Sequence, residues 1–364
     1  MSTIKNILDK LKTSSTDTTP QEWQTLLEIT DPKELQQLYD AAYQLKLKTV
    51  ESNVYFRGIV EMSNICDKDC YYCGIRHSNK NVKRYDMSED EVVREALWAH
   101  KNHYGSIVLQ SGELQNVNFT NKIERILKRI KKESNGELGI TISLGEQTEE
   151  IYRTWFEAGA HRYLLRIETS NPELYGKLHP ASHSFQTRVD CLDKLRKVGY
   201  QVGTGVMIGL PGQTTADLAQ DIAFFRDRDI DMIGMGPYIV HSETPLAKTA
   251  GNINEEEQLN MGLKMIAVTR LVLRDINIAA TTALQALHAT GREMGLKAGA
   301  NVIMPNLTDT SYRKGYQLYE GKPCLDENST MCQGCLESRI ASIGETIGLD
   351  QWGDSPHFIK RTKK

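Results

Sequence analysis

Three cysteines lie close together in the sequence, Cys66, Cys70 and Cys73, with the spacing Cys-x3-Cys-x2-Cys. Thiolates are the ligands that iron–sulfur clusters prefer, and short spacings let one turn of chain hold one face of a cluster. If these three thiolates hold a 4Fe-4S cluster, one iron has no protein ligand and can bind a substrate or a cofactor. Tyr72 directly precedes the third cysteine, and its aromatic ring could lie against a ring the size of adenine.

This spacing, with an aromatic residue before the third cysteine, resembles the signature of the radical S-adenosylmethionine (SAM) enzymes. The resemblance implies that the methionyl moiety of SAM binds the open iron and that the reduced cluster cleaves SAM to a 5′-deoxyadenosyl radical. A structural zinc site is the alternative, because His77 follows Cys73 by four residues. Zinc normally has four protein ligands in paired knuckles, and no second knuckle follows at a suitable distance, so we favour the cluster.

A second group of cysteines, Cys324, Cys332 and Cys335, has the spacing Cys-x7-Cys-x2-Cys near the C-terminus. Clustered cysteines in a reducing compartment are typical of metal sites, so these thiolates could hold an accessory 2Fe-2S or 4Fe-4S cluster. Three ordinary thiols in a terminal extension are the alternative. The remaining cysteine, Cys191, stands among apolar residues and is expected to be a small core residue.

The composition is that of an ordinary globular protein, because 40% of the 364 residues are hydrophobic and 25% are charged. A net charge of −3 and an isoelectric point near 6.3 give no reason to expect nucleic acid or an anionic membrane as a partner. No stretch approaches the roughly 20 apolar residues that span a bilayer. The first residues also lack the apolar core of a signal peptide. We therefore expect a cytoplasmic protein without a membrane or nucleic-acid partner.

From Val54 onward, short apolar runs alternate with amphipathic stretches eight times, which predicts a parallel α/β sheet. The count of eight indicates a complete (β/α)8 barrel of the TIM type, and a partial barrel of six units is the alternative. One of the expected helices covers 284–296. The predicted strands are 54–60, 106–109, 138–143, 162–165, 202–208, 232–233, 277–280 and 301–304.

The chain outside the barrel has two expected parts. Residues 1–50 predict a helical segment, because Asp31 can cap a helix whose first residue is Pro32. The barrel is expected over 51–310. Residues 311–364 form a C-terminal extension that carries the second cysteine group and ends in a basic, frayed tail.

Polar residues follow the predicted strands at the end of the barrel where such folds build their sites. Arg166 and Glu168, at the end of the strand over 162–165, are both candidates for SAM binding. Glu168 could accept hydrogen bonds from ribose hydroxyls, and a surface salt bridge with Arg166 is the alternative. Arg188, at the start of the next helix, could pair with the methionyl carboxylate or could be a solvated helix residue. Small residues that let a ligand approach the backbone, or that form plain turns, follow two other strands at Ser111, Gly112 and Ser143.

The region from Val54 to Cys335 resembles the HydE family, the radical SAM maturases of iron-iron hydrogenase. The resemblance implies a complete barrel, a 4Fe-4S cluster on the first three cysteines, and SAM contacts from Ser143, Glu168 and Arg188. In some members of the family, cysteines like the second group bind another iron–sulfur centre. The resemblance is carried by the stretches at 57–66, 78–85, 108–113, 143–146, 162–166, 209–214 and 300–306.

The resemblance also implies a substrate and partners. The substrate would be a small organometallic or amino-acid-derived molecule, such as a cysteine-bound iron dicarbonyl cyanide unit, used to assemble the diiron subcluster. The partners would be a tyrosine-cleaving radical SAM enzyme, a scaffold GTPase, and a reductant such as flavodoxin or ferredoxin.

One residue departs from the family motif, because Ile167 stands where a histidine is expected beside Glu168. An imidazole beside the radical site would thus be replaced by an aliphatic group, which leaves the substrate open. A carbon-skeleton mutase like methylornithine synthase is therefore the alternative enzyme. A structural metal-binding module without turnover is the alternative from another class.

Overall fold

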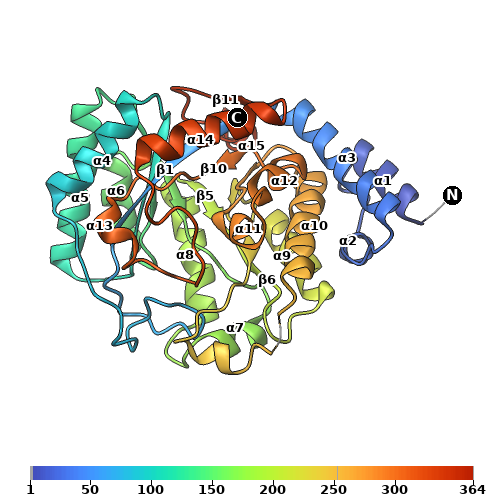
Figure 1. The fold of residues 1–364 in the computed structure, drawn as a ribbon, viewed down its shortest axis with the longest axis horizontal. Coiled ribbons are helices and arrows are strands. Elements are labelled where there is room, and N and C mark those ends of the chain that lie inside the picture. The colour runs from blue at the N-terminus through green and yellow to red at the C-terminus, as the bar shows by residue number, and fades with distance from the viewer. Residues whose placement is uncertain (1–2, 252, 364) are drawn as a thin grey trace.

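The computed structural model describes residues 3–251 and 253–363, and the side chain of Cys332 lies outside the described part. Three helices open the chain: α1 (Thr3–Thr13), α2 (Pro20–Leu27) and α3 (Pro32–Thr49). The predicted cap is present, because the Asp31 side chain accepts hydrogen bonds from the backbone N–H groups of Lys33 and Glu34. The three helices contact α10 (Glu255–Leu273) and project at the right of Figure 1.

A curled parallel sheet forms the centre of the molecule. Its strands follow one another in the order β10-β1-β2-β3-β4-β5-β7-β9, and β11 pairs with β1. All eight predicted strand positions fall on strands of this path. The bounds are β1 (Asn53–Ser63), β2 (Ser106–Ser111), β3 (Gly139–Ser143), β4 (Arg162–Leu164), β5 (Gln201–Thr204), β7 (Met232–Ile233), β9 (Asn277–Ile278), β10 (Val302–Ile303) and β11 (Thr346–Ile347).

The two ends of this path, β9 and β10, approach each other. An isolated parallel bridge joins Ala279 to Val302. The Ala280 N–H donates to the Val302 carbonyl at 2.9 Å, and the Asn301 N–H donates to the Ile278 carbonyl at 2.9 Å. The alternation therefore predicted the fold class correctly, an α/β fold with a curled parallel sheet like that of a TIM barrel.

Helices connect the strands and surround the sheet (Figure 1). Their starts are set locally, as at Ser88, which forms a capping box with Glu91, and at Thr214, which forms one with Asp217. The helices are α4 (Glu89–Lys101), α5 (Val117–Glu133), α6 (Glu149–Glu157), α7 (Pro172–Leu178), α8 (Phe185–Val198), α9 (Thr215–Asp227), α11 (Thr282–Leu287) and α12 (Gly291–Lys297).

Two predicted elements are divided in the structure. The strand expected over 202–208 is β5 followed by β6 (Met207–Ile208), which pairs with β8 (Gly236–Pro237) in a separate small sheet. The helix expected over 284–296 is two helices, α11 and α12. The chain turns back between them so closely that a Cβ on Gly291 would lie 2.0 Å from the Leu284 carbonyl oxygen. Glycine permits this contact, which a continuous helical pattern does not reveal.

The C-terminal region contains α13 (Thr310–Arg313), α14 (Ser329–Ser342), β11 and α15 (Pro356–Thr362). The expectation of a frayed tail was wrong, because Arg361 in α15 forms ion pairs with Asp229 and with the fully buried Asp231. α14 and α15 lie along the upper edge of Figure 1, opposite α7 at the lower edge. Among the described residues, no helix combines the length and apolar character needed to cross a membrane.

Candidate functional site

A cavity of about 310 Å³ lies at the ends of the strands where the polar clusters were predicted. Residues from β1, β2 and β3 line it together with the loops that follow β4, β9 and β10. All ten residues predicted to hold the first cluster or SAM line this one cavity: Cys66, Cys70, Tyr72, Cys73, Ser111, Gly112, Ser143, Arg166, Glu168 and Arg188.

The loop that carries the first cysteines is held by buried polar contacts. Asn64, at the end of β1, donates hydrogen bonds to the Lys83 and Gly315 carbonyls and accepts one from the Tyr85 N–H. The Arg84 guanidinium donates to four backbone carbonyls of the same loop, which belong to Asn64, Ile75, Arg76 and Asn79. These contacts fix the path of residues 64–85 without using the cysteines themselves.

The three thiols are partly covered by protein. Burial raises the pKa of Cys70 to about 12, and burial also raises the pKa values of Cys66 and Cys73. The Glu113 N–H donates to Cys66 Sγ at 3.3 Å. Buried thiols release their protons when a bound cation supplies compensating positive charge, so this environment suits metal ligation.

The spread of the thiols distinguishes a cluster from a single ion. A tetrahedral zinc ion holds its sulfur ligands about 3.8 Å apart. Among the described residues, one group of three Cys, His, Asp or Glu ligand atoms lies within 4.8 Å, and it contains Cys70 but neither Cys66 nor Cys73. At least one pair of the three thiols therefore lies more than 4.8 Å apart, which is wider than one zinc ion holds its ligands and suits a larger polynuclear cluster.

Arg188 is buried rather than solvated, with 7% of its surface exposed. Its Nε donates to Glu146 at 2.6 Å, and its Nη1 donates to the Arg166 carbonyl at 2.8 Å. Burial alone would lower the pKa of Arg188, but the Glu146 carboxylate raises it well above its usual value. Lys68 completes the group, because its ammonium lies 2.8 Å from Glu146 and 3.2 Å from Glu113.

Glu168 has an unusual backbone and an incompletely paired carboxylate. Its φ is +65°, a left-handed conformation that costs a residue with a side chain about 1 to 3 kcal/mol. Backbone hydrogen bonds with Gly205 and Met207 hold this conformation. Arg166 Nη2 lies 2.9 Å from Glu168 Oε2, yet this oxygen and Arg166 Nε are buried without a hydrogen bond in the described protein. The ion pair exists, and both groups still have unused hydrogen-bonding capacity.

Tyr72 is fixed by a histidine that the sequence did not single out. The Tyr72 ring meets His179 edge-on, with centroids 5.5 Å apart, and the Tyr72 hydroxyl lies 3.4 Å from His179 Nε2. His179 Nδ1 lies 2.9 Å from the Tyr175 carbonyl oxygen. Burial lowers the pKa of His179 to about 3, so its ring is neutral at physiological pH.

The glycines near the cavity have local packing reasons. A Cβ on Gly112 would lie 2.2 Å from the Ile65 carbonyl oxygen, so this glycine lets β2 approach the cysteine loop. Gly145 has a φ of +78°, and a Cβ there would lie 2.1 Å from Glu113 Oε2. The sequence suggested that Gly112 lets a ligand approach the backbone. In the structure, the close approach that Gly112 permits is that of the cysteine loop.

Several further lining residues were not assigned a role from the sequence. Lys68 lies inside the cysteine loop, and Glu113, Thr281 and Thr282 follow predicted strands, so their positions were the available signal. The others had none: Glu61 and Lys322 form an ion pair across the cavity wall, and Met304 and Tyr319 line it as well.

Ile167 lies in the hydrophobic core and is not among the cavity-lining residues. The expectation of an aliphatic group beside the radical site was therefore wrong, because the neighbours of Ile167 in sequence face the cavity while its own side chain faces the core. The second cysteine group does not line this cavity either. Cys324 is half-buried with a φ of +62°, Cys335 is exposed on α14, and the side chain of Cys332 lies outside the described part.

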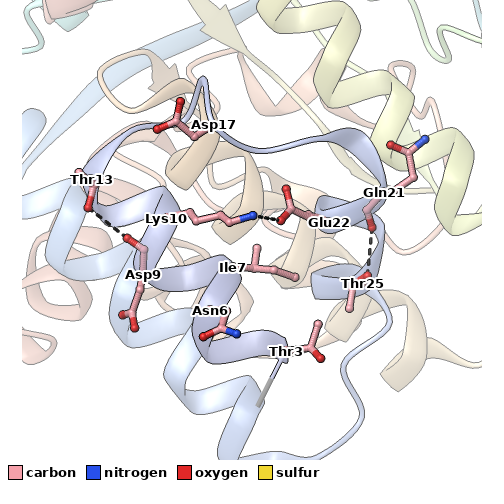
Figure 2. Close-up of a pocket in the computed structure, with 10 residues that line it drawn as sticks. All are labelled: Thr3, Asn6, Ile7, Asp9, Lys10, Thr13, Asp17, Gln21, Glu22 and Thr25. Carbon is pink, nitrogen blue, oxygen red and sulfur yellow. Dashed lines mark hydrogen bonds and ion pairs between the residues drawn. The ribbon is translucent and has the colours of Figure 1, made fainter. Parts of the chain in front are cut away.

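A wider surface hollow of about 760 Å³ lies between α1 and α2, remote from the cysteines (Figure 2). Lys10 and Glu22, which face each other across it, pair at 2.7 Å. Thr13 and Thr25 donate their hydroxyls to backbone carbonyls of their own helices. These four side chains already have partners within the two helices, and the hollow is a polar groove on the N-terminal helices.

Comparison with known proteins places this geometry in a family. The pattern of the Radical SAM superfamily matches residues 60–225. The FeFe hydrogenase maturase subunit HydE of Thermotoga maritima is 44% identical over 352 residues, which cover 96% of this chain and 97% of that protein. The 3-methylornithine synthase of Methanosarcina acetivorans is 26% identical over 297 residues, which cover 81% of each chain.

Solved structures show the same fold. The methylornithine synthase PylB superposes with a TM-score of 0.79 at 22% identity, covering 94% of this chain and 98% of its own. The hydrogenase maturase HydG superposes with a TM-score of 0.77 at 20% identity, covering 93% of this chain and 74% of its own. The structural matches establish the fold, and the sequence match to HydE establishes the family. The chain belongs to the radical SAM superfamily and, within it, to the HydE family of hydrogenase maturases.

Proposed function

We propose that this protein is a radical SAM enzyme whose product is used to assemble the diiron subcluster of iron-iron hydrogenase. The observation that carries the proposal is the convergence of three separated thiols and seven predicted SAM residues on one cavity, in a chain 44% identical to HydE. Cys66, Cys70 and Cys73 would hold a 4Fe-4S cluster. When bound, the reduced cluster and SAM supply a 5′-deoxyadenosyl radical.

The protein's own groups would orient SAM. Arg188 is held by Glu146 and by the Arg166 carbonyl through Nε and Nη1, which leaves Nη2 for the methionyl carboxylate. Glu168 Oε2 is a buried acceptor without a hydrogen bond, as a carboxylate that receives ribose hydroxyls would be. Tyr72, braced by His179, would stack against adenine, and Ser111, Gly112 and Ser143 would line the approach to the backbone.

The substrate would occupy the remaining part of the cavity. Lys322, which is paired with Glu61, lines that part together with Thr281 and Thr282, and the Thr281 hydroxyl donates to the Met235 carbonyl at 3.3 Å. Such a polar lining suits a small organometallic or amino-acid-derived substrate better than an apolar one. The partners would be the tyrosine-cleaving maturase and the scaffold GTPase, with flavodoxin or ferredoxin as reductant, in the cytoplasm.

We also propose that the curled sheet is a complete barrel and that the chain has three parts. The hydrogen bonds of Ala280 and Asn301 with β10 and β9 support a complete barrel of eight strands. The barrel would span residues 51–310, between a helical segment over 1–50 and an extension over 311–364. Cys324, Cys332 and Cys335 in that extension would hold the accessory 2Fe-2S or 4Fe-4S cluster.

The first experiment measures SAM cleavage by the full-length protein. After anaerobic reconstitution with iron and sulfide and reduction with dithionite, we expect methionine and 5′-deoxyadenosine in equal amounts. A protein that carries four irons on the first site and makes no 5′-deoxyadenosine would refute radical SAM activity and favour a metal-binding module.

A second experiment distinguishes the maturase from a mutase. Hydrogenase maturation in a cell-free mixture that lacks only its HydE component should recover when this protein is added. A relative at 26% identity is a 3-methylornithine synthase, and 3-methylornithine is an isomer of lysine, so lysine is the substrate to offer a carbon-skeleton mutase in parallel. Conversion of lysine without recovery of hydrogenase activity would favour the mutase.

A further inference from the structure

A pair of histidines approaches the cysteine loop from the connection between α7 and α8. The connection is attached to that loop, because the Tyr71 N–H donates to the Leu178 carbonyl at 2.9 Å. His179 and His183 lie on this connection, with ring centroids 5.7 Å apart. One ligand atom from each histidine and the Cys70 sulfur lie within 4.8 Å of one another.

The two imidazoles are oriented as metal ligands usually are. His179 Nδ1 faces the Tyr175 carbonyl oxygen at 2.9 Å, so its proton lies on Nδ1. Its lone pair lies on Nε2, where a metal ion would replace the Tyr72 hydroxyl that now lies 3.4 Å away. Tyr175 also stacks on the His179 ring at 4.0 Å, which fixes the plane of the ring. His183 Nδ1 is buried and makes no hydrogen bond in the described protein, so this ring is not committed to another group.

We propose that the protein, while it lacks its cluster, binds one borderline divalent metal ion of the Zn²⁺ class at Cys70, His179 and His183. Two imidazoles and one thiolate match the ligand preference of such ions, and a water molecule completes a tetrahedron. Bond lengths of about 2.0 to 2.3 Å place the ligand atoms of one ion about 3.3 to 3.8 Å apart. Side-chain rotations that move each ligand atom by about 1 Å therefore bring all three atoms within bonding distance of one ion.

The ion and the cluster exclude each other, because both need the Cys70 thiolate. This consequence rests on the proposed function, whereas binding of the ion does not. A zinc ion at this site occupies one of three cluster ligands and draws Cys70 toward the histidines. Cluster assembly on Cys66 and Cys73 then requires removal of the ion. The site therefore makes cluster loading sensitive to the zinc level in which the protein is prepared.

Cobalt titration of the cluster-free, full-length protein tests the site directly. Under anaerobic conditions after chelation of iron, we expect one Co²⁺ per chain, tetrahedral ligand-field bands, and a charge-transfer band of one thiolate. Replacing both histidines in the variant His179→Gln/His183→Gln should weaken Co²⁺ binding by at least about tenfold. The single variant His183→Gln, in the loop, should also weaken it and leaves the contacts of His179 in place.

Matched variants identify the ligands. Cys70→Ser should remove the charge-transfer band, whereas Cys66→Ser, Cys73→Ser and His77→Gln should retain it. Equal loss in Cys66→Ser or Cys73→Ser would place the ion on the three cysteines and overturn the proposal. Undiminished Co²⁺ binding by the double histidine variant, with wild-type circular dichroism, would also overturn it.

The competition is measured as iron uptake rather than as activity. Wild-type protein loaded with one Zn²⁺ should take up iron several-fold more slowly than zinc-free protein, and a zinc chelator should restore the rate. The double histidine variant should take up iron at the same rate with and without Zn²⁺. If zinc binds as expected but leaves iron uptake unchanged, Cys70 is not a cluster ligand, and the proposed function fails while the zinc site stands.

Discussion

The two ends of the curled sheet differ in what their buried polar groups face. At the end opposite the cavity, here called the floor, the C-terminal segment 346–356 lies across the strands. The Gly353 carbonyl accepts hydrogen bonds from Arg57 at 3.0 Å and from Asn277 at 2.7 Å. The fully buried Arg162 donates to Asp354 at 2.7 Å and to the Trp352 carbonyl at 2.8 Å.

At the cavity end, here called the mouth, comparable groups face an open volume. Glu168 Oε2 and Glu113 Oε1 are buried beside one cation each, Arg166 and Lys68, and Arg166 Nε has no hydrogen bond in the described protein. A buried polar group costs about 1 to 3 kcal/mol when it is left unsatisfied, so a ligand that completes such contacts is stabilised. Arg57 Nε and Arg162 Nη2 at the floor are also buried without a hydrogen bond, but they belong to side chains whose other atoms hold the C-terminal segment, whereas the polar groups of the mouth line the cavity. This contrast predicts that mutations at the mouth change activity and mutations at the floor change stability.

The largest effect is expected from the cluster ligands. Replacing Cys70 by Ala removes one of three thiolates and should abolish 5′-deoxyadenosine formation, measured by chromatography after anaerobic reconstitution. The free energy of unfolding of the cluster-free protein should change little, because the loop is held by Asn64 and Arg84. Cys335→Ser on α14 is the matched control, and retained SAM cleavage by Cys70→Ala would contradict the assignment.

The next effect concerns the floor. Asp354→Ala leaves the buried Arg162 guanidinium without its carboxylate and should lower the free energy of unfolding by about 3 kcal/mol. The SAM dissociation constant should stay unchanged, because the floor lies away from the cavity. Asp326→Ala, which removes an ion pair with Lys314 that is exposed on both sides, is the control and should change stability by less than about 0.5 kcal/mol.

The same pair predicts a pH dependence. Burial opposes ionisation of Asp354, but His161 and Arg162 together hold the pKa of this carboxyl well below its usual value of 3.8. Since the folded-state pKa is the lower one, the pair stabilises the fold fully above the unfolded-state pKa. That contribution should be lost as the pH falls below about 4 toward the folded-state pKa. Urea unfolding between pH 7 and pH 3 should therefore show a steeper acid loss for the wild type than for Asp354→Ala.

A smaller effect is expected at the mouth from Glu168. Glu168→Ala removes a charged acceptor worth roughly 1.5 to 3 kcal/mol, so SAM affinity should weaken by about ten- to a hundredfold. Calorimetry on cluster-loaded protein measures this directly. Glu173→Ala, an exposed carboxylate on α7, serves as the control. An unchanged dissociation constant in Glu168→Ala would remove Glu168 from the SAM site.

Local patterns in the sequence predicted the mouth better than the floor. The spacing of Cys66, Cys70 and Cys73 and the polar residues at strand ends were sufficient to predict ten of the residues that line the cavity. The strand positions followed from apolar runs, because each strand is buried on both faces. The cap at Asp31 was likewise visible, since its partners lie within three residues.

Contacts between distant segments could not be predicted in this way. Arg162 and Asp354 are separated by 192 residues, and Arg188 and Glu146 by 42 residues, so no short period connects them. The same holds for His179, which stands in a loop without a repeating pattern and still reaches Tyr72. From the sequence, a charged residue near the C-terminus is predicted to be solvated. Arg361 shows why this prediction fails, because the fold places it beside the buried Asp231.

The second cysteine group extends the comparison of floor and mouth, because its described residues were found neither among the floor contacts nor in the lining of the mouth. The Cys324 carbonyl accepts a hydrogen bond from Arg313 at 2.8 Å, and Cys335 is exposed on α14. A cluster held there by three thiolates would lie nearer to solvent than the first and would be lost more easily. We therefore expect the variant Cys324→Ser/Cys332→Ser/Cys335→Ser to contain less iron than the wild type and to cleave SAM at the same rate. Iron analysis and 5′-deoxyadenosine measurement on the same reconstituted sample test this directly. Loss of cleavage while the first cluster remains loaded would instead give the second group a role in electron transfer to the mouth.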